Sequence, residues 1–186
     1  MSKIKIDPGP FVLPMPVALI GAKVDEKPNF MPAAFIGIVN FKPPVVACGL
    51  NPTHYTCDGI SANGTFSLNL PGPELVEAAD WCGLKSGRKQ DKSRVFETFA
   101  GELGNAPMIK SCRLTAECRL IKTVPFEVDT VYFGEVVSVY VDAQALKDGA
   151  PDWQKINPLF FTFPDKAYWQ LGRCIAEAWS VGKTFK

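Results

Sequence analysis

Several features on which common enzyme classes depend are missing from this chain of 186 residues. It has one histidine, His54, so a metal site built from two or more histidines is excluded. No GxSxG motif is present, which argues against a hydrolase that would use His54 as its base. Walker A and GxGxxG motifs are also absent, so the sequence predicts neither a P-loop nor a Rossmann dinucleotide site.

Charge and hydropathy argue against further classes of partner. The chain has 20 Lys and Arg against 19 Asp and Glu, and its net charge of +1 favours neither nucleic acid nor an anionic membrane. No apolar run reaches the roughly 20 residues of a membrane helix. Phe11–Ala22 resembles a signal peptide, but Pro14 and Pro16 interrupt it. We interpret this segment as an irregular entry into a first strand and expect a cytoplasmic protein.

The six cysteines form no CxxC pair, so zinc, iron–sulfur and thioredoxin-type sites lack their usual spacing, and we predict no metal site. Cys48 and Cys118 lie in strand-like apolar runs. We interpret the cysteines as small buried apolar residues in a reducing compartment, with a disulfide framework as the alternative.

The distribution of chain-breaking residues and short apolar runs predicts a mainly β fold. With 15 glycines and 16 prolines, many short segments joined by turns are favoured over a helical bundle. The period of two in Thr65–Leu70 indicates a half-buried strand. Further strands are expected at Val17–Val24, Ala33–Phe41, Val45–Leu50, Leu114–Thr123, Val131–Asp142 and Phe160–Phe163. We therefore predict a single domain over residues 1–186, a β-barrel with short α-helices.

Three helices are expected beside these strands. Cys57–Asn63 is preceded by Thr56, a good N-cap residue, and followed by Gly64, a good C-terminal residue. Pro73–Trp81 has a proline near its start, which suits a helix. Apolar residues spaced three to four apart predict a final helix over 165–179.

Two segments have residue types that suit a phosphate group. Asn51–Thr56 leads into a helix start, where free N–H groups and the helix dipole favour anions, and the hydroxyls of Thr53 and Thr56 can add donors. Plain capping of the helix by Thr56 is the alternative. The loop from Lys85 to Arg94 contains five basic residues and one acid, Asp91. A solvated surface is the alternative there; together the two segments suggest a phosphorylated cofactor.

Seven segments occur in this order: PMPVALIGA, KPNFMPAAFIGIVN, PPVVACGLN, THYTCDGISANGTFSLNLP, CGLKSGRKQDKS, FGEVVSVYVD and INPLFFTFPDKAYWQLG. The ordered set resembles the flavin reductase-like, FMN-binding split-barrel family, and within it the flavoredoxin group. The resemblance covers nearly the whole chain. It implies a split β-barrel of Greek-key character that works as a homodimer and binds FMN near the subunit interface.

The resemblance also implies which residues contact FMN. Beside the isoalloxazine it places Asn29, Met31, Pro32, Ala33, Ala34 and Phe35. Around the ribityl chain and phosphate it places Asn51, Thr53, Thr56, Ser86, Asp91 and Lys92. Phe35, Phe163, Tyr168 and Trp169 could stack on a planar ring, or could belong to the core. Relatives often have a histidine where this chain has Asp129.

The function implied is electron transfer through bound FMN, from a donor such as NAD(P)H or a redox protein to an acceptor. The flavin itself carries the chemistry, so no catalytic side chain is expected. The protein would be an FMN-dependent oxidoreductase, either a reductase that exchanges FMN or a carrier that keeps it. The alternative is a non-catalytic barrel that stores or senses a flavin or another anion.

Overall fold

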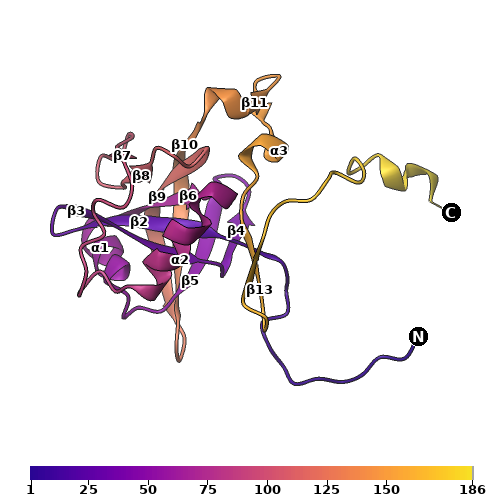
Figure 1. Cartoon of the computed structure of the whole chain (residues 1–186), viewed down its shortest axis with the longest axis horizontal. Helices are drawn as coiled ribbons and strands as arrows, with labels where there is room; N and C mark the ends of the chain where they lie inside the picture. The colour runs from indigo at the N-terminus through magenta and orange to yellow at the C-terminus, as the bar shows by residue number, and fades with distance from the viewer. Residues whose placement is uncertain (186) are drawn as a thin grey trace.

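A computed structural model describes residues 1–185, and a seven-stranded antiparallel sheet forms its centre. The strand order is β3-β2-β6-β9-β10-β5-β4, so β3 and β4 are the two edges (Figure 1). Because β3 also contacts β5, the sheet curves into a barrel. The strands are β2 (Ala18–Val24), β3 (Lys27–Ala33), β4 (Ile36–Asn40), β5 (Val45–Leu50), β6 (Thr65–Leu70), β9 (Leu114–Pro125) and β10 (Thr130–Val141). The predicted mainly β fold is confirmed.

The core has two apolar clusters. One lies inside the barrel, and the other lies on its outer side under the helix that contains Ala79 and Cys82. The inner cluster includes Ile20, Cys48 and Phe66, which are fully buried. Ser67 and Asn69, on the other face of β6, are fully buried as well. Ser67 Oγ donates to the Pro107 carbonyl, and Asn69 Oδ1 accepts from the Ile109 N–H at 2.8 Å. The prediction of a half-buried β6 is therefore wrong, because the 106–109 segment covers its polar face.

Helix α1 (Tyr55–Asn63) packs against β2 and ends at Gly64, whose φ of 65° is the left-handed conformation expected of a helix end. Its N-cap residue is His54, and no side-chain cap is formed there. The prediction that Thr56 caps this helix is wrong, since Thr56 lies inside the first turn and is buried. The helix approaches β2 closely because residue 59 is glycine: a Cβ there would lie 2.3 Å from the Lys23 carbonyl oxygen.

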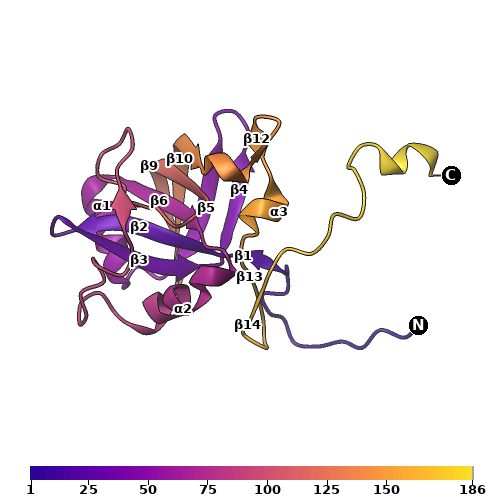
Figure 2. The same cartoon turned by 45° about the horizontal axis from the view of Figure 1, so that its top comes forward.

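Helix α2 (Val76–Leu84) follows a 3₁₀ turn, η1 (Pro73–Leu75), and packs on β3 (Figure 2). It buries Ala79 and Cys82 in the outer apolar cluster. The prediction of a helix over Pro73–Trp81 is thus confirmed in place and type, with its end three residues later. No helix among residues 1–185 is long and apolar enough to cross a membrane.

Smaller elements lie between α2 and β9 and between β10 and β13. Two short hairpins are formed by β7 (Thr98–Phe99) with β8 (Met108–Ile109) and by β11 (Leu146–Lys147) with β12 (Ala150–Pro151). Two single turns flank the second hairpin, the 3₁₀ turn η2 (Ala143–Ala145) and the helical turn α3 (Trp153–Ile156).

The C-terminal segment contradicts the predicted helix over 165–179. Its first part is β14 (Ala167–Trp169), which pairs with β13 (Phe160–Thr162), and β13 pairs in turn with β1 (Met15–Pro16). Helical spacing was overridden because strand pairing sets Phe161 opposite Tyr168, with their tilted rings in contact and the ring centroids 5.6 Å apart. Beyond β14 the chain forms an arm with one short 3₁₀ turn, η3 (Val181–Thr184). Both terminal arms extend away from the barrel on the same side (Figures 1 and 2).

Candidate functional site

Two adjoining clefts lie along β3, next to the start of α1. The first, the helix-side cleft, has a volume of about 380 Å³ and lies between β3, the first turn of α1 and the segment that follows α2. The second, the sheet-side cleft, measures about 210 Å³ and lies between the end of β3, the end of β5 and Phe163. Met31, Pro32 and His54 line both, so the two clefts form one groove.

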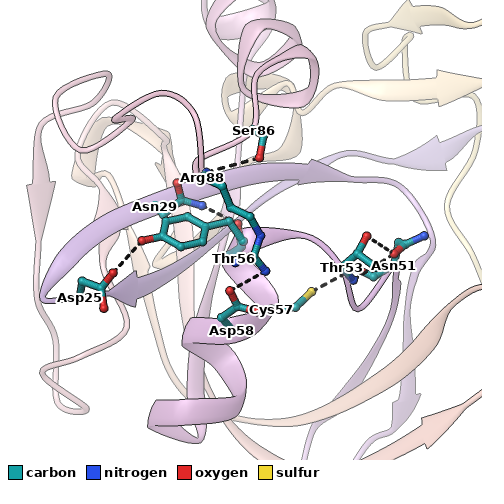
Figure 3. A network of polar contacts seen from close by, with 10 residues as sticks. Asp25, Asn29, Asn51, Thr53, Thr56, Cys57, Asp58, Ser86 and Arg88 are labelled. Atoms are coloured by element: carbon teal, nitrogen blue, oxygen red, sulfur yellow. Dashed lines mark hydrogen bonds and ion pairs between the residues drawn. The ribbon is translucent and has the colours of Figure 1, made fainter.

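The start of α1 gives the helix-side cleft an electropositive wall. Because His54 forms no side-chain cap, the N–H groups of the first turn keep the partial positive charge of a helix N-terminus. In the preceding turn, Asn51 Oδ1 accepts from Thr53 N at 3.0 Å and from Thr53 Oγ1 at 2.7 Å (Figure 3). The hydroxyl of Thr53 is therefore engaged by Asn51, and the Asn51 side chain fixes the turn that leads into the helix.

Thr56 and Asn29 join α1 to β3 at the floor of this cleft. Asn29 Nδ2 donates to Thr56 Oγ1 at 2.7 Å, and both side chains are buried (Figure 3). A hydroxyl has one donor and two acceptor positions, so accepting from Asn29 leaves the Thr56 O–H free to donate. Thr56 can therefore offer a hydrogen bond to an anion in the cleft while it holds the two elements together.

The segment after α2 forms the opposite wall. Lys85 and Ser86 are exposed and line the cleft. Lys89 N and Gln90 N each donate to the Ser86 carbonyl at 3.0 Å, so the chain turns sharply here. This turn places Lys85 and Ser86 in the wall of the cleft.

Lys92 is buried, so the alternative of a solvated surface does not hold for this residue of the basic loop. It is 4% exposed, and its Nζ donates to the carbonyls of Cys82 at 2.6 Å and Phe30 at 3.0 Å. Burial lowers the pKa of Lys92, and the neighbouring Cys82 raises it by a smaller amount. Lys92 thus places a buried amine in the wall of the cleft and ties α2 to β3.

Asp91 lies outside the groove. It lines a neighbouring cleft of about 220 Å³ and forms an ion pair with Lys27 at 3.0 Å. Hydrogen bonds from Ser93, followed by the contact with Lys27, hold the pKa of Asp91 below its usual range. Its carboxylate orients the loop and does not face the groove.

The sheet-side cleft is mostly apolar. Residues 31–35 run along one wall, and Gly49 lies against the Phe35 side chain on the other. Asp129, just before β10, and Phe163, just beyond β13, also line it. Because β3 is an edge strand, no neighbouring strand pairs with its outer backbone groups. The cleft can therefore hold a planar apolar group with backbone polar atoms at its rim.

The structure brings together nearly all the residues that the sequence suggested. The predicted residues that line the groove are Asn29, Met31, Pro32, Ala33, Ala34, Phe35, Asn51, Thr53, Thr56, Ser86 and Lys92. Sequence reasoning did not assign His54 and Tyr55, which line the helix-side cleft. Their position between Thr53 and Thr56, at the first residues of a helix, was the signal that could have identified them.

Known proteins share the fold of this chain. Residues 12–167 match the family described as "Flavin reductase like domain". The chain belongs to this family. It is similar to a flavoredoxin from Methanosarcina acetivorans, with 44% identity, full coverage of both chains and a TM-score of 0.96. It is also similar to the flavoredoxin of Desulfovibrio vulgaris (Miyazaki F), with 32% identity over 98% of this chain and 100% of that one and a TM-score of 0.92.

A further relative is an uncharacterized protein of Archaeoglobus fulgidus, which is 31% identical over 144 residues, 76% of this chain and 80% of that protein. The family match and the two similar structures confirm the predicted flavin reductase-like split-barrel fold. Within that fold, the groove described above is the candidate cofactor site of this protein.

Proposed function

We propose that this protein is an FMN-binding flavoprotein that passes electrons between a donor and an acceptor. One observation carries the proposal: a single groove has an electropositive polar end and an apolar end. FMN has the matching asymmetry, with a phosphate at one end and a planar ring system at the other. The two similar structures, each named as a flavoredoxin, support the same assignment.

The helix-side cleft fits the phosphate. The first turn of α1 offers uncapped N–H groups, Thr56 has a free O–H, and Ser86 adds a second hydroxyl. Charged donors strengthen hydrogen bonds to an anion, and Lys92 and Lys85 supply positive charge in the same walls. Thr53 would act by shaping the turn before α1, because Asn51 Oδ1 accepts from both its N–H and its hydroxyl.

The sheet-side cleft fits the ring system. Met31, Pro32 and Phe35 give it apolar walls, and the outer edge of β3 offers backbone groups to the polar edge of the ring. FMN, when bound, supplies the redox chemistry by taking up and releasing electrons. The protein would bind and orient it and leave one side open to the electron donor.

The cysteines are poorly suited to carry the electrons instead. Burial raises the pKa of Cys57 to about 11 and that of Cys48 to about 12, so these thiols stay protonated near neutral pH. No cysteine forms a disulfide among the described residues, and five of the six are buried. Free buried thiols support a reducing, cytoplasmic location as part of the proposal.

The donor is proposed to be NAD(P)H or a redox protein. Purified protein should show a flavin absorbance spectrum, which anaerobic NADH or NADPH should bleach if either is the donor. Turnover with and without added flavin separates a reductase that exchanges FMN from a carrier that retains it. A colourless protein that does not quench FMN fluorescence in a titration would contradict the proposal and favour a barrel for another anion.

We also propose a homodimer. An apolar cleft of about 560 Å³ on the β4–β5–β10 face shares Phe35, Gly49 and Asp129 with the sheet-side cleft. On the arms, Ile175 is 91% and Trp179 95% exposed. In a dimer, a second copy of the chain would cover this apolar face and would give the exposed arms a surface to pack against. Light scattering should give twice the 20.4 kDa chain mass, and a monomer with FMN fully bound would contradict it.

A further inference from the structure

An ion pair beside the helix-side cleft links α1 to the segment after α2. Arg88 Nη2 lies 2.7 Å from Asp58 Oδ2, in the first turn of α1 (Figure 3). The Arg88 guanidinium also lies over the Tyr55 ring, 5.4 Å from its centroid. Tyr55 in turn donates its hydroxyl hydrogen to Asp25 Oδ2 at 2.9 Å. Arg88 is thus fastened to α1 through two neighbouring side chains.

Arg88 is also part of the segment that forms the opposite wall. Its backbone N–H donates to Ser86 Oγ at 3.3 Å. Between them, Gly87 rests directly on β3 and α1: a Cβ at this position would lie 2.3 Å from Asn29 Oδ1 and 2.5 Å from Tyr55 Cδ1. The position of Ser86 and Gly87 at the cleft therefore depends on close contact with Asn29 and Tyr55, which Arg88 maintains.

We propose that Asp58 and Arg88 are positioning residues that hold Ser86 and Gly87 against α1 and thereby set the lifetime of a bound phosphate-bearing flavin. The inference rests on the proposed function. Arg88 is already engaged by Asp58 and Tyr55, so its role is to fasten the wall and not to contact the phosphate. Loosening the pair frees the 86–88 segment to move away from the cleft, which opens the route by which FMN leaves.

Simple electrostatics and this proposal predict opposite signs for one substitution. Asp58→Asn removes a negative charge from the first turn of a helix whose N-terminus faces the cleft. Through charge alone, the substitution would strengthen the binding of a phosphate and slow its release. Through the Arg88–Asp58 pair, it would release the wall and speed the loss of FMN. The direction of the change therefore separates the two explanations.

The test measures FMN release by the recovery of flavin fluorescence after rapid dilution. The side chains of the pair are 51% and 41% exposed, so its strength is that of a surface ion pair. Asp58→Asn and Arg88→Ala should each release FMN about 2- to 5-fold faster than wild type. Gly87→Ala should also speed release, because its Cβ displaces the segment. Arg88→Lys, which keeps the charge, should restore part of the wild-type lifetime.

The exposed ion pair between Lys110 and Glu97, neither of which lines the groove, provides a matched control, and Glu97→Gln should leave the rate unchanged. Slower or unchanged release from Asp58→Asn, while FMN still binds, would overturn the positioning role and leave the proposed function intact. Wild-type protein that binds no FMN would overturn the proposed function, and this inference with it. Riboflavin, which lacks the phosphate, should show a smaller difference between wild type and Asp58→Asn.

Discussion

Replacing Lys92 by methionine tests the most unexpected feature of the groove, its buried amine. Methionine keeps an unbranched apolar stem but removes the donors to the Cys82 and Phe30 carbonyls. Each hydrogen bond to a charged group contributes about 1.5–3 kcal/mol, and relief from burying the ammonium offsets part of the loss. Lys92→Met should therefore lower the free energy of unfolding of the apoprotein by about 2–4 kcal/mol. Urea denaturation followed by tryptophan fluorescence measures it.

The same substitution should also affect the cofactor. Loss of the positive charge in the wall should weaken FMN binding by about 1.5–3 kcal/mol, the range for bonds to charged groups. Riboflavin should bind wild type and Lys92→Met about equally. Lys89, an exposed lysine of the same loop, provides the matched control. Lys89→Met should leave the free energy of unfolding unchanged within about 0.5 kcal/mol.

The change in stability of wild type relative to Lys92→Met at alkaline pH has a sign that can be checked. Burial lowers the pKa of Lys92 below its ordinary value of 10.5, so the unfolded chain takes up this proton first as the pH falls. Within the window between the two pKa values, wild type should lose stability relative to Lys92→Met as the pH falls. An apoprotein as stable as wild type after Lys92→Met, with FMN affinity unchanged, would refute both the buried contacts and the charge in the wall.

Three further predictions concern the groove and the core. Thr56→Val removes the O–H while keeping the shape, so FMN affinity should fall by about 1.5–3 kcal/mol, whereas Thr56→Ser should retain most of it in fluorescence titrations. Burial raises the pKa of Cys48 from 9.0 to about 12, so its contribution to stability is complete below pH 9 and is lost as the pH rises. Between pH 8 and pH 10, wild type should lose about 1.4 kcal/mol more of its free energy of unfolding than Cys48→Ala does. Cys57→Ala should leave the anaerobic reduction of bound flavin largely intact; lost reduction with FMN still bound would show that a thiol takes part.

Local patterns in the sequence determined much of the fold and of the site. Short apolar or alternating runs predict the strands β5, β6 and β10, and Gly64 predicts the end of the helix α1. These signals lie within a few neighbouring residues. The two segments proposed to bind the phosphate could be found in the same way. A helix start with hydroxyl residues and a loop rich in basic residues suit an anion whatever the rest of the chain does.

Only the tertiary structure decided which side chains are buried and which segments meet. Lys92 reads as an exposed loop residue until α2 and β3 enclose it, and Asn69 reads as a solvent-facing strand residue until the 106–109 segment covers it. The helical spacing after Asp165 lost to pairing between β13 and β14. In each case the deciding partner is remote in the sequence or comes from strand pairing, and burial is a property of such contacts, which no local pattern contains.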